Sequence, residues 1–287
     1  MHNIGIFRRC GNTLCVLALI CPGRSTAQFL ALDERLSAEV CALGGCGASM
    51  RIPGWGPAVN PAGLSDSVHL GIVAGVRPAL FGLSELRRFG LGVTWSGRTV
   101  GSGLVAVSEG SPLFHVEGGM LAGAASVTES VAIGVGVCGE QMSFQRYGSV
   151  RYWALTVGLL VDAGDLLTIG TVVENPTRNW IVRGLERAPS RVRSDMSFQA
   201  AEHFLAVVGV GLEEHTPPTV GGGAAYSIVD GVKVRLGLTT DPDVFSAGID
   251  VGMNGIVVGA AAWMHADLGW SEQIEIGFIM PAGGDSE

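Results

Sequence analysis

Apolar residues occupy every second position along most of the chain, from residue 67 to residue 280. In the first run, apolar residues at Val68, Leu70, Ile72, Ala74 and Val76 alternate with small or polar ones. A period of two is that of a β-strand, in which successive side chains point to opposite faces. The pattern therefore predicts strands with one apolar face and one small or polar face.

Fourteen runs of this kind follow one another, separated by turn signals such as Asp230-Gly231 and Asn254-Gly255. They predict strands at residues 67–76, 87–96, 99–108, 113–126, 129–140, 150–161, 164–174, 190–199, 202–213, 218–228, 231–240, 243–253, 255–266 and 270–280. The eighth run suits a long loop equally well, because Arg191, Arg193 and Asp195 fall within it. An even number of strands is typical of single-chain bacterial outer-membrane barrels.

Composition favours a barrel in a membrane over a soluble domain. The 287 residues are 47% hydrophobic and 15% charged and include 44 Gly, with a mean hydropathy of +0.40. After the N-terminus there is no stretch of about 18 apolar residues without charge, which a spanning helix needs. A closed barrel pairs every backbone group between strands. The predicted fold is therefore all-β, a transmembrane antiparallel up-and-down barrel of about 14 strands with an irregular N-terminal plug.

The first 27 residues have the organisation of a secretory signal peptide. Arg8 and Arg9 precede an apolar run at 14–20, and the small residues Ser25-Thr26-Ala27 follow it. We expect residues 1–27 to be cleaved after export. Together with the predicted barrel, this export signal places the mature protein in the bacterial outer membrane.

Residues 28–66 are too rich in Pro and Gly for regular strands. An irregular segment can lie at membrane depth only inside a barrel, or it must lie outside the bilayer. We predict a plug or hatch at 28–66, the barrel at 67–280 and a polar tail at 281–287. The stretch Asn60, Pro61, Ala62, Gly63 and Leu64 would form the hinge between plug and barrel: Pro fixes the turn, and Asn can bond local backbone amides.

Several charged residues fall on the inward-facing register of the predicted strands. A charge that faces lipid at the membrane midplane costs about 2–4 kcal/mol, so we expect these side chains to face the lumen. They would either pair with one another and with the plug, closing the lumen, or guide a substrate through it. The candidate lumen-lining residues are His69, Glu174, Lys233, Arg235, Asp250 and Glu275.

Cys41 and Cys46 are close enough in sequence to bridge in an oxidising periplasm. The alternative is that both are small apolar residues packed in the plug. With Cys138, the mature chain has an odd number of cysteines, which cannot all pair within one molecule.

The motifs of common catalytic and cofactor sites are not found in the sequence. No His stands at zinc-ligand spacing from another His or Cys, and the Gly-rich pieces lack the Lys and Ser or Thr of a phosphate loop. The net charge of −8 argues against nucleic acid as a partner. We therefore predict no catalytic residue, metal or cofactor. An outer-membrane enzyme would need a Ser, a His and an acid on the outer rim.

Short motifs at both ends of the mature chain carry a family resemblance. They are A-L-G-G-C-G-A at 42–48, N-P-A-G-L at 60–64, and F-S-A-G-I at 245–249 followed by H-A-D-L-G-W-S at 265–271. This combination resembles the PorV/PorQ-like outer-membrane barrels, relatives of the FadL-type long-chain fatty-acid transporters. The resemblance implies a 14-stranded barrel with an N-terminal hatch that includes Asn60, Pro61 and Ala62.

Two functions are compatible with this resemblance. The first is a transporter or gated channel for small hydrophobic or amphipathic solutes, with the hatch closing the lumen. The second is a sealed barrel that acts as a scaffold or shuttle in protein secretion. The expected partners are outer-membrane lipid and either a hydrophobic small molecule or a protein of the secretion machinery.

Overall fold

The computed structural model describes residues 32–65, 69–178, 180–182, 186–187 and 189–281. The predicted signal peptide, residues 28–31 and 66 of the predicted plug, and residues 282–287 of the predicted tail lie outside these ranges. None of the helices in the described ranges has the length and apolarity to cross a membrane.

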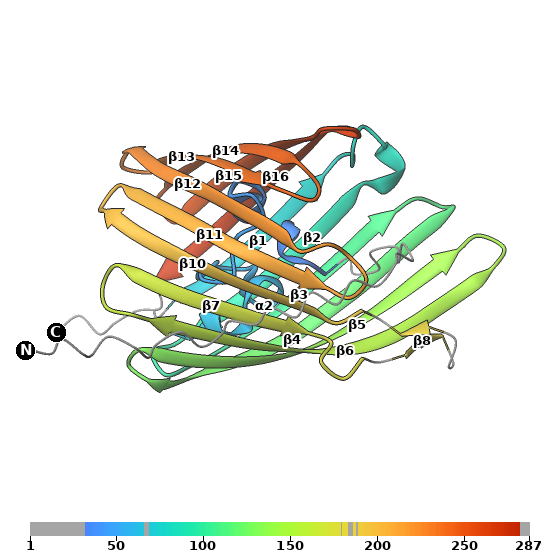
Figure 1. The fold of residues 1–287 in the computed structure, drawn as a ribbon, viewed down its shortest axis with the longest axis horizontal. Helices are drawn as coiled ribbons and strands as arrows, with labels where there is room; N and C mark the ends of the chain where they lie inside the picture. The colour runs from blue at the N-terminus through green and yellow to red at the C-terminus, as the bar shows by residue number, and fades with distance from the viewer. Residues whose placement is uncertain (1–31, 66–68, 179, 183–185, 188, 282–287) are drawn as a thin grey trace, which may run out of the picture.

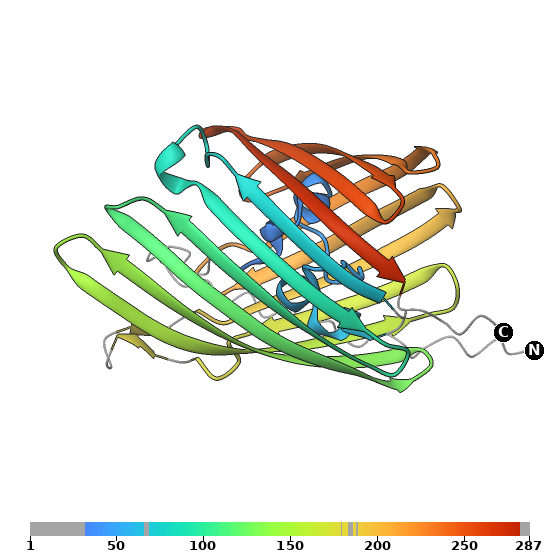
Figure 2. The same cartoon turned by 180° about the vertical axis from the view of Figure 1, so that it is seen from behind.

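Fourteen antiparallel strands form a closed barrel, which Figures 1 and 2 show from opposite sides. The barrel closes where the first strand, β1, pairs with the last, β16. The strands are β1 (His69–Arg77), β2 (Arg88–Ser96), β3 (Val100–Gly110), β4 (Phe114–Thr128), β5 (Val131–Phe144), β6 (Gly148–Asp162), β7 (Leu167–Glu174), β10 (Arg191–Ala201), β11 (Phe204–Glu213), β12 (Thr219–Val229), β13 (Val232–Thr239), β14 (Val244–Met253), β15 (Ile256–His265) and β16 (Gly269–Pro281). The predicted fold class is confirmed.

Each predicted run corresponds to one strand of the barrel. The uncertain eighth run is β10, which pairs with β7 on one side and β11 on the other. Its polar residues Arg193 and Asp195 are buried, because they face inward and contact chain inside the barrel. The hairpin of β5 and β6 is longer than predicted, since pairing continues through Phe144 and Gly148.

The two ends of the barrel differ in their connections. We call one the turn end, where short turns at 97–99, 129–130, 163–166, 202–203, 230–231 and 254–255 join the strands. We call the other the loop end, which carries the longer connections 78–87 and 175–190. These two contain η3 (Ser84–Leu86) and a separate two-stranded sheet of β8 (Trp180–Val182) and β9 (Glu186–Arg187).

Apolar side chains cover the outer surface of the barrel, as the alternation predicts. Leu91, Leu104, Leu121, Val135 and Leu236 are among the large apolar residues that are half exposed or more. Exposed aromatic residues form two belts, Trp95, Phe198, Phe204 and Tyr226 near the turn end and Phe89, Trp153, Phe245 and Trp270 near the loop end. An apolar band between two aromatic belts is typical of a wall that faces lipid.

Residues 32–65 lie inside the barrel, where Figure 1 shows them as a blue chain between the walls. We call these residues the inner segment. It contains η1 (Glu34–Leu36), α1 (Ala38–Ala42), α2 (Gly56–Val59) and η2 (Pro61–Leu64). Helix α1 packs against β13 to β16, and η2 packs against β2 to β6. The inner segment therefore spans the lumen from one wall to the other.

Glycines on the inner face of the wall let the inner segment come close. A Cβ added to Gly101 would lie 1.8 Å from the carbonyl oxygen of Leu64, and one on Gly170 would lie 1.9 Å from that of Ala48. Neither position has room for a larger side chain unless the inner segment moves. Close backbone approach is thus one physical reason for the high glycine content.

The closed lumen as candidate functional site

The predicted hinge residues join three parts of the molecule. Asn60 is fully buried, and its Oδ1 accepts a hydrogen bond from the amide of Ala62 at 3.0 Å, which caps η2. Its Nδ2 donates to the carbonyl oxygens of Ala48, at 2.5 Å, and of Leu159 in β6, at 3.2 Å. Pro61 is the first residue of η2. Asn60 therefore connects two stretches of the inner segment to the wall.

The other hinge residues pack without charged contacts. Ala62 forms a small apolar cluster with Ala132 and Leu160 of the wall. Leu64 is 1% exposed and belongs to the main apolar cluster of the lumen. Gly63 lies beside the backbone of residues 50–51. These contacts fix η2 near the turn end.

A buried ion cluster lies between the inner segment and β1 to β3 near the loop end. Arg88 binds Asp33 of the inner segment at 2.8 Å and Glu109 at 2.5 Å. Arg77 binds the other oxygen of Glu109 at 2.7 Å. Two positive and two negative side chains thus neutralise one another. The sequence prediction did not include this cluster, although the outward position of Phe89 implies that Arg88 points inward.

A second ion cluster joins α1 to the opposite wall. Arg235 of β13 is 2% exposed and binds Glu39 at 2.7 Å. It also pairs with Asp250 of β14. The structure therefore brings together two of the predicted lumen residues and adds a partner from the inner segment. Lys233 lies opposite Asp250 in the register but is exposed, and His69 is half-buried at the start of β1.

Wall carboxylates also bind the backbone of the inner segment. Glu275 accepts from the amide of Ala38 and from the indole nitrogen of Trp55, both at 2.9 Å. Asp195 accepts from two consecutive amides, those of Gly47 at 2.7 Å and Ala48 at 2.5 Å. Bonds of this kind hold the irregular chain in place, because each satisfies a buried backbone donor.

Two further buried wall carboxylates, Glu140 and Glu174, contact the inner segment, directly or through an arginine. Glu140 accepts from the amide of Leu32 at 2.9 Å and from the Tyr152 hydroxyl at 2.7 Å. Glu174 pairs with Arg193 at 2.8 Å, and Arg193 in turn donates to the carbonyl oxygen of Val59 at 3.0 Å. Of the carboxylates that act on the inner segment, the sequence singled out Glu174, Asp250 and Glu275. It missed Glu109, Glu140, Asp195 and Asp162, which pairs with Arg51 of the inner segment at 2.6 Å. The inward register positions of these residues were the available signal.

Two cavities beside the inner segment, within the part of the chain that the structure describes, are too small for a solute. One of about 10 Å³ is lined by Leu32, Ala58, Met120 and Glu174 among others. Another of about 30 Å³ lies between Gly44 and Asp195. A cavity needs about 10–15 Å³ to hold one water molecule. Each of these two cavities has room for one or two waters, so the inner segment fills the lumen at these places.

The lumen has an apolar side and a charged side. On the apolar side, the inner faces of β3, β4 and β5 pack against Leu32 and Leu36 of the inner segment, through Val105, Val107, Val116, Met120 and Met142. On the charged side, Glu39 and Ala38 meet Arg235, Asp250 and Glu275. An apolar solute would find its most favourable surface along the apolar side.

The two cysteines of the inner segment form no disulfide, so the pairing considered from sequence is not formed in this structure. Both are buried thiols. Cys41 packs with Ala261 and Trp263 of β15, whereas Cys46 packs with Val207 and Ala225 of β11 and β12. The helix α1 and the turn after it direct the two side chains to different walls. Burial raises the pKa of the Cys41 thiol to about 12.

Comparisons with known proteins find structures with the same fold, but no relative that is recognisable by its sequence. No protein-family model matches the chain, and no curated protein matches it. Among solved structures, the CymD monoaromatic hydrocarbon channel matches with a TM-score of 0.61 at 13% identity, over 86% of this chain and 100% of that one. The chain has the fold of the FadL-type barrels.

Two more solved structures support this assignment of the fold. The Pseudomonas putida toluene transporter TodX matches with a TM-score of 0.60 at 10% identity, covering 84% of this chain and 95% of its own. A Pseudomonas aeruginosa FadL homologue matches with a TM-score of 0.59 at 10% identity, over 86% and 98% of the two chains. At these identities the likeness establishes the fold. The predicted relation to PorV/PorQ-like barrels stays a prediction.

Proposed function

We propose that the protein is an outer-membrane channel for small hydrophobic or amphipathic solutes, closed by its N-terminal plug. The observation that supports this most is that a separate segment, rather than the wall itself, fills the lumen. A barrel whose own side chains filled its interior would have nothing to move. Here the wall can stay intact while the closing element shifts.

The contacts of the inner segment are of a kind that can be exchanged. Beside the apolar packing they include hydrogen bonds and ion pairs to single side chains, such as Arg88 with Asp33 and Arg235 with Glu39. A hydrogen bond to a charged group contributes about 1.5–3 kcal/mol net. Arg88 and Arg235 each also have a partner in the wall, since Glu109 and Asp250 remain with these two arginines. Displacing the inner segment therefore leaves both arginines paired.

The apolar side of the lumen suggests the chemistry of the solute. Once the inner segment moves, the inner faces of β3 to β5 offer a continuous apolar surface with few charges. This surface suits hydrocarbons and acyl chains better than ions or sugars. The two named channels that share the fold are described as a monoaromatic hydrocarbon channel and a toluene transporter, which agrees with such a solute.

The remaining assignments complete the proposal. Residues 1–27 serve as a cleaved export signal, 28–66 as the plug, 67–280 as the membrane-spanning barrel and 281–287 as a polar tail. The proposed channel contains no catalytic residue and needs no cofactor. Its partners are outer-membrane lipid and a hydrophobic small molecule. A sealed scaffold in protein secretion is the alternative outcome of the test below.

The test compares the wild-type chain with a deletion of residues 29–60. Uptake of radiolabelled oleate and toluene is measured in cells whose outer membrane carries either protein, and ion conductance is measured in planar bilayers. Faster uptake with the wild type than with empty membranes, together with a larger conductance of the deletion variant, supports the channel. Absence of uptake and conductance in both, with recovery of a stable protein partner, would instead favour the secretion scaffold. Heat-dependent mobility in gels checks that both barrels are folded.

A further inference from the structure

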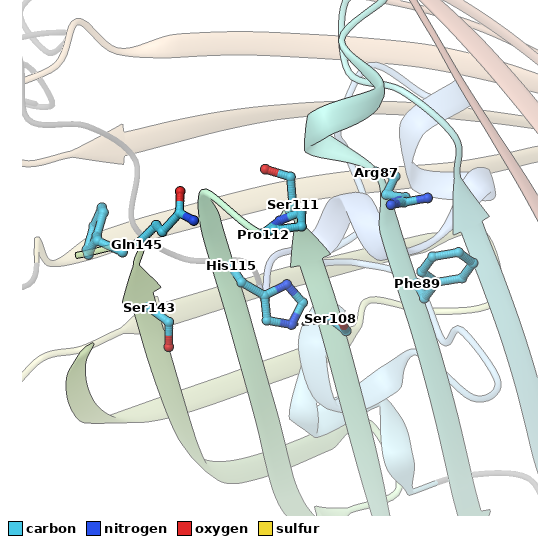
Figure 3. Close-up of a pocket in the computed structure, with 10 residues that line it drawn as sticks. Arg87, Phe89, Ser108, Ser111, Pro112, His115, Ser143 and Gln145 are labelled. Carbon is cyan, nitrogen blue, oxygen red and sulfur yellow. Dashed lines mark hydrogen bonds between the residues drawn. The ribbon is translucent and has the colours of Figure 1, made fainter. Parts of the chain in front are cut away.

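A groove of about 530 Å³ lies on the outer surface of the wall near the loop end. It crosses β2 to β5, and its lining includes Arg87, Phe89, Ser108, Pro112, His115 and Phe144. Figure 3 shows His115 pointing toward Ser108, with Phe89 on the neighbouring strand β2 and Arg87 just before that strand. The groove is separate from the lumen, because these positions alternate with the inward-facing Arg88 and Glu109.

The strand register gives the level of the groove relative to the membrane. One outward row is Leu91, Ala106, Gly119, Gly139 and Trp153, which is apolar and ends on a residue of the aromatic belt. The next row toward the loop end is Phe89, Ser108, Glu117, Gln141 and Arg151. The change from apolar to polar side chains marks the place where hydrocarbon gives way to lipid headgroups.

The groove lies at this boundary. Phe89 belongs to the row in which polar side chains first appear. Arg87 and His115 lie one row closer to the loop end: the amide of Gly110 donates to the carbonyl oxygen of Arg87, and Gly110 lies opposite His115 in the ladder. A ligand whose polar end sits at Arg87 and whose apolar end runs over Phe89 would continue into the hydrocarbon. Membrane lipids have this arrangement.

The charges of the groove favour an anionic headgroup. Arg87 is exposed, and no ion pair is recorded for it within the ranges that the structure describes. His115 Nε2 lies 3.4 Å from Ser108 Oγ and 3.3 Å from Glu117 Oε1. The negative charge of Glu117 beside His115 offsets any positive charge on the imidazole, so Arg87 supplies the main attraction for an anion. Its guanidinium can bind two phosphate oxygens at once.

The size of the groove also agrees with a lipid that is only partly enclosed. Ligand pockets have volumes of about 300–1,000 Å³. A volume of about 530 Å³ accommodates a phosphate headgroup and the first part of its chains, but not a whole lipid. The chains can remain in the bilayer, along Leu91 and Leu104, which are exposed on the same wall.

We propose that this groove binds the phosphate headgroup of one anionic membrane lipid at the loop end, with Arg87 and His115 at the phosphate and the acyl chains over Phe89. The bound lipid holds the β3 to β6 hairpins at a fixed height in the membrane. This assignment depends on the barrel spanning a membrane and not on transport, so it stands or falls separately from the channel.

The experiment measures lipid binding to the full chain in detergent by native mass spectrometry. The probes are dioleoyl phosphatidylglycerol, dioleoylglycerol, which lacks the phosphate, and inorganic phosphate. We compare the wild type with the double variant Arg87→Gln, His115→Gln and with Arg98→Gln. Arg98 is an exposed arginine at the turn end, so its variant controls for a general effect of charge.

We expect the double variant to bind phosphatidylglycerol at least about fivefold more weakly, since one cation near an anionic surface contributes about that factor. Arg98→Gln should change binding less than about twofold. Arg87→Lys keeps the charge and should retain most of the affinity. Heat-dependent gel mobility shows whether each variant is folded.

Three results would overturn the proposal. One is an equal loss of binding in Arg98→Gln and in the double variant, which indicates general electrostatics. Another is equal affinity for phosphatidylglycerol and dioleoylglycerol, which indicates that the phosphate is not recognised. The third is inorganic phosphate competing as well as the lipid, which indicates a site for free phosphate.

Discussion

Replacing Glu39 with alanine removes the carboxylate through which α1 binds Arg235. The side chain of Glu39 is 20% exposed and its oxygen lies 2.7 Å from the guanidinium. Arg235 keeps its pairing with Asp250, so no buried charge on the wall loses all partners. The substitution therefore weakens the attachment of the inner segment while leaving the barrel ladder intact.

The magnitude follows from the type of contact that is lost. A hydrogen bond between charged groups contributes about 1.5–3 kcal/mol, and the partial exposure of Glu39 places the loss toward the lower value. At about 1.4 kcal/mol per factor of ten, the fraction of molecules with a displaced α1 should rise about tenfold or somewhat more.

Cys41, two residues further along α1, reports this displacement. Burial raises the pKa of its thiol to about 12, so very little of the reactive thiolate is present at pH 8 while the segment is in place. Displacement restores an ordinary thiol, which reacts far faster. The assay is the rate of maleimide labelling of the native protein in detergent, with the modified peptide identified by mass spectrometry.

The control is Glu129→Ala, which removes an exposed acid in the turn between β4 and β5. We expect about a tenfold faster labelling of Cys41 in Glu39→Ala and no change in the control. A labelling rate that stays within about twofold of the wild type would refute the reasoning, because it would show that this ion pair does not hold α1 in place.

Three other predictions concern the same closure. Gly101→Ala places a methyl group against the carbonyl oxygen of Leu64 and should raise bilayer conductance. Gly119→Ala is the control, because its methyl group would lie 3.6 Å from the nearest atom and should leave conductance unchanged. Equal conductance of the two variants would contradict the role of close approach. Asn60→Ala loses three hydrogen bonds and should destabilise the closed state by about 1–3 kcal/mol. The amides of η2 should then exchange faster with solvent. Unchanged exchange would contradict the role of Asn60 in holding η2. Because burial raises the pKa of Cys41 to about 12, its contribution to the closed state is complete below about pH 9 and is lost as the pH rises toward 12. Amide exchange of α1 should therefore accelerate over that range more in the wild type than in Cys41→Ala, and identical profiles would rule this out.

The strands could be predicted from the sequence because their information is local. Each outward residue, such as Phe89 or Leu91, is followed by an inward one, and the lipid and the lumen impose opposite demands on the two faces. Even β10 obeys this rule, since Arg193 and Asp195 both occupy inward positions. The alternation along each strand therefore determined which side chains could reach the lumen.

The partners of those side chains depended on the tertiary structure. Glu39 and Arg235 are 196 positions apart, and Leu32 and Glu140 are 108 apart, so no local pattern connects them. The same holds for the two cysteines, which are near in sequence but packed on different walls. Sequence alone determined a closed barrel with small and charged residues inside, because alternation is a short-range property. Only the path of the inner segment across the lumen decided which charges close it, because that path is set by the shape of the whole barrel.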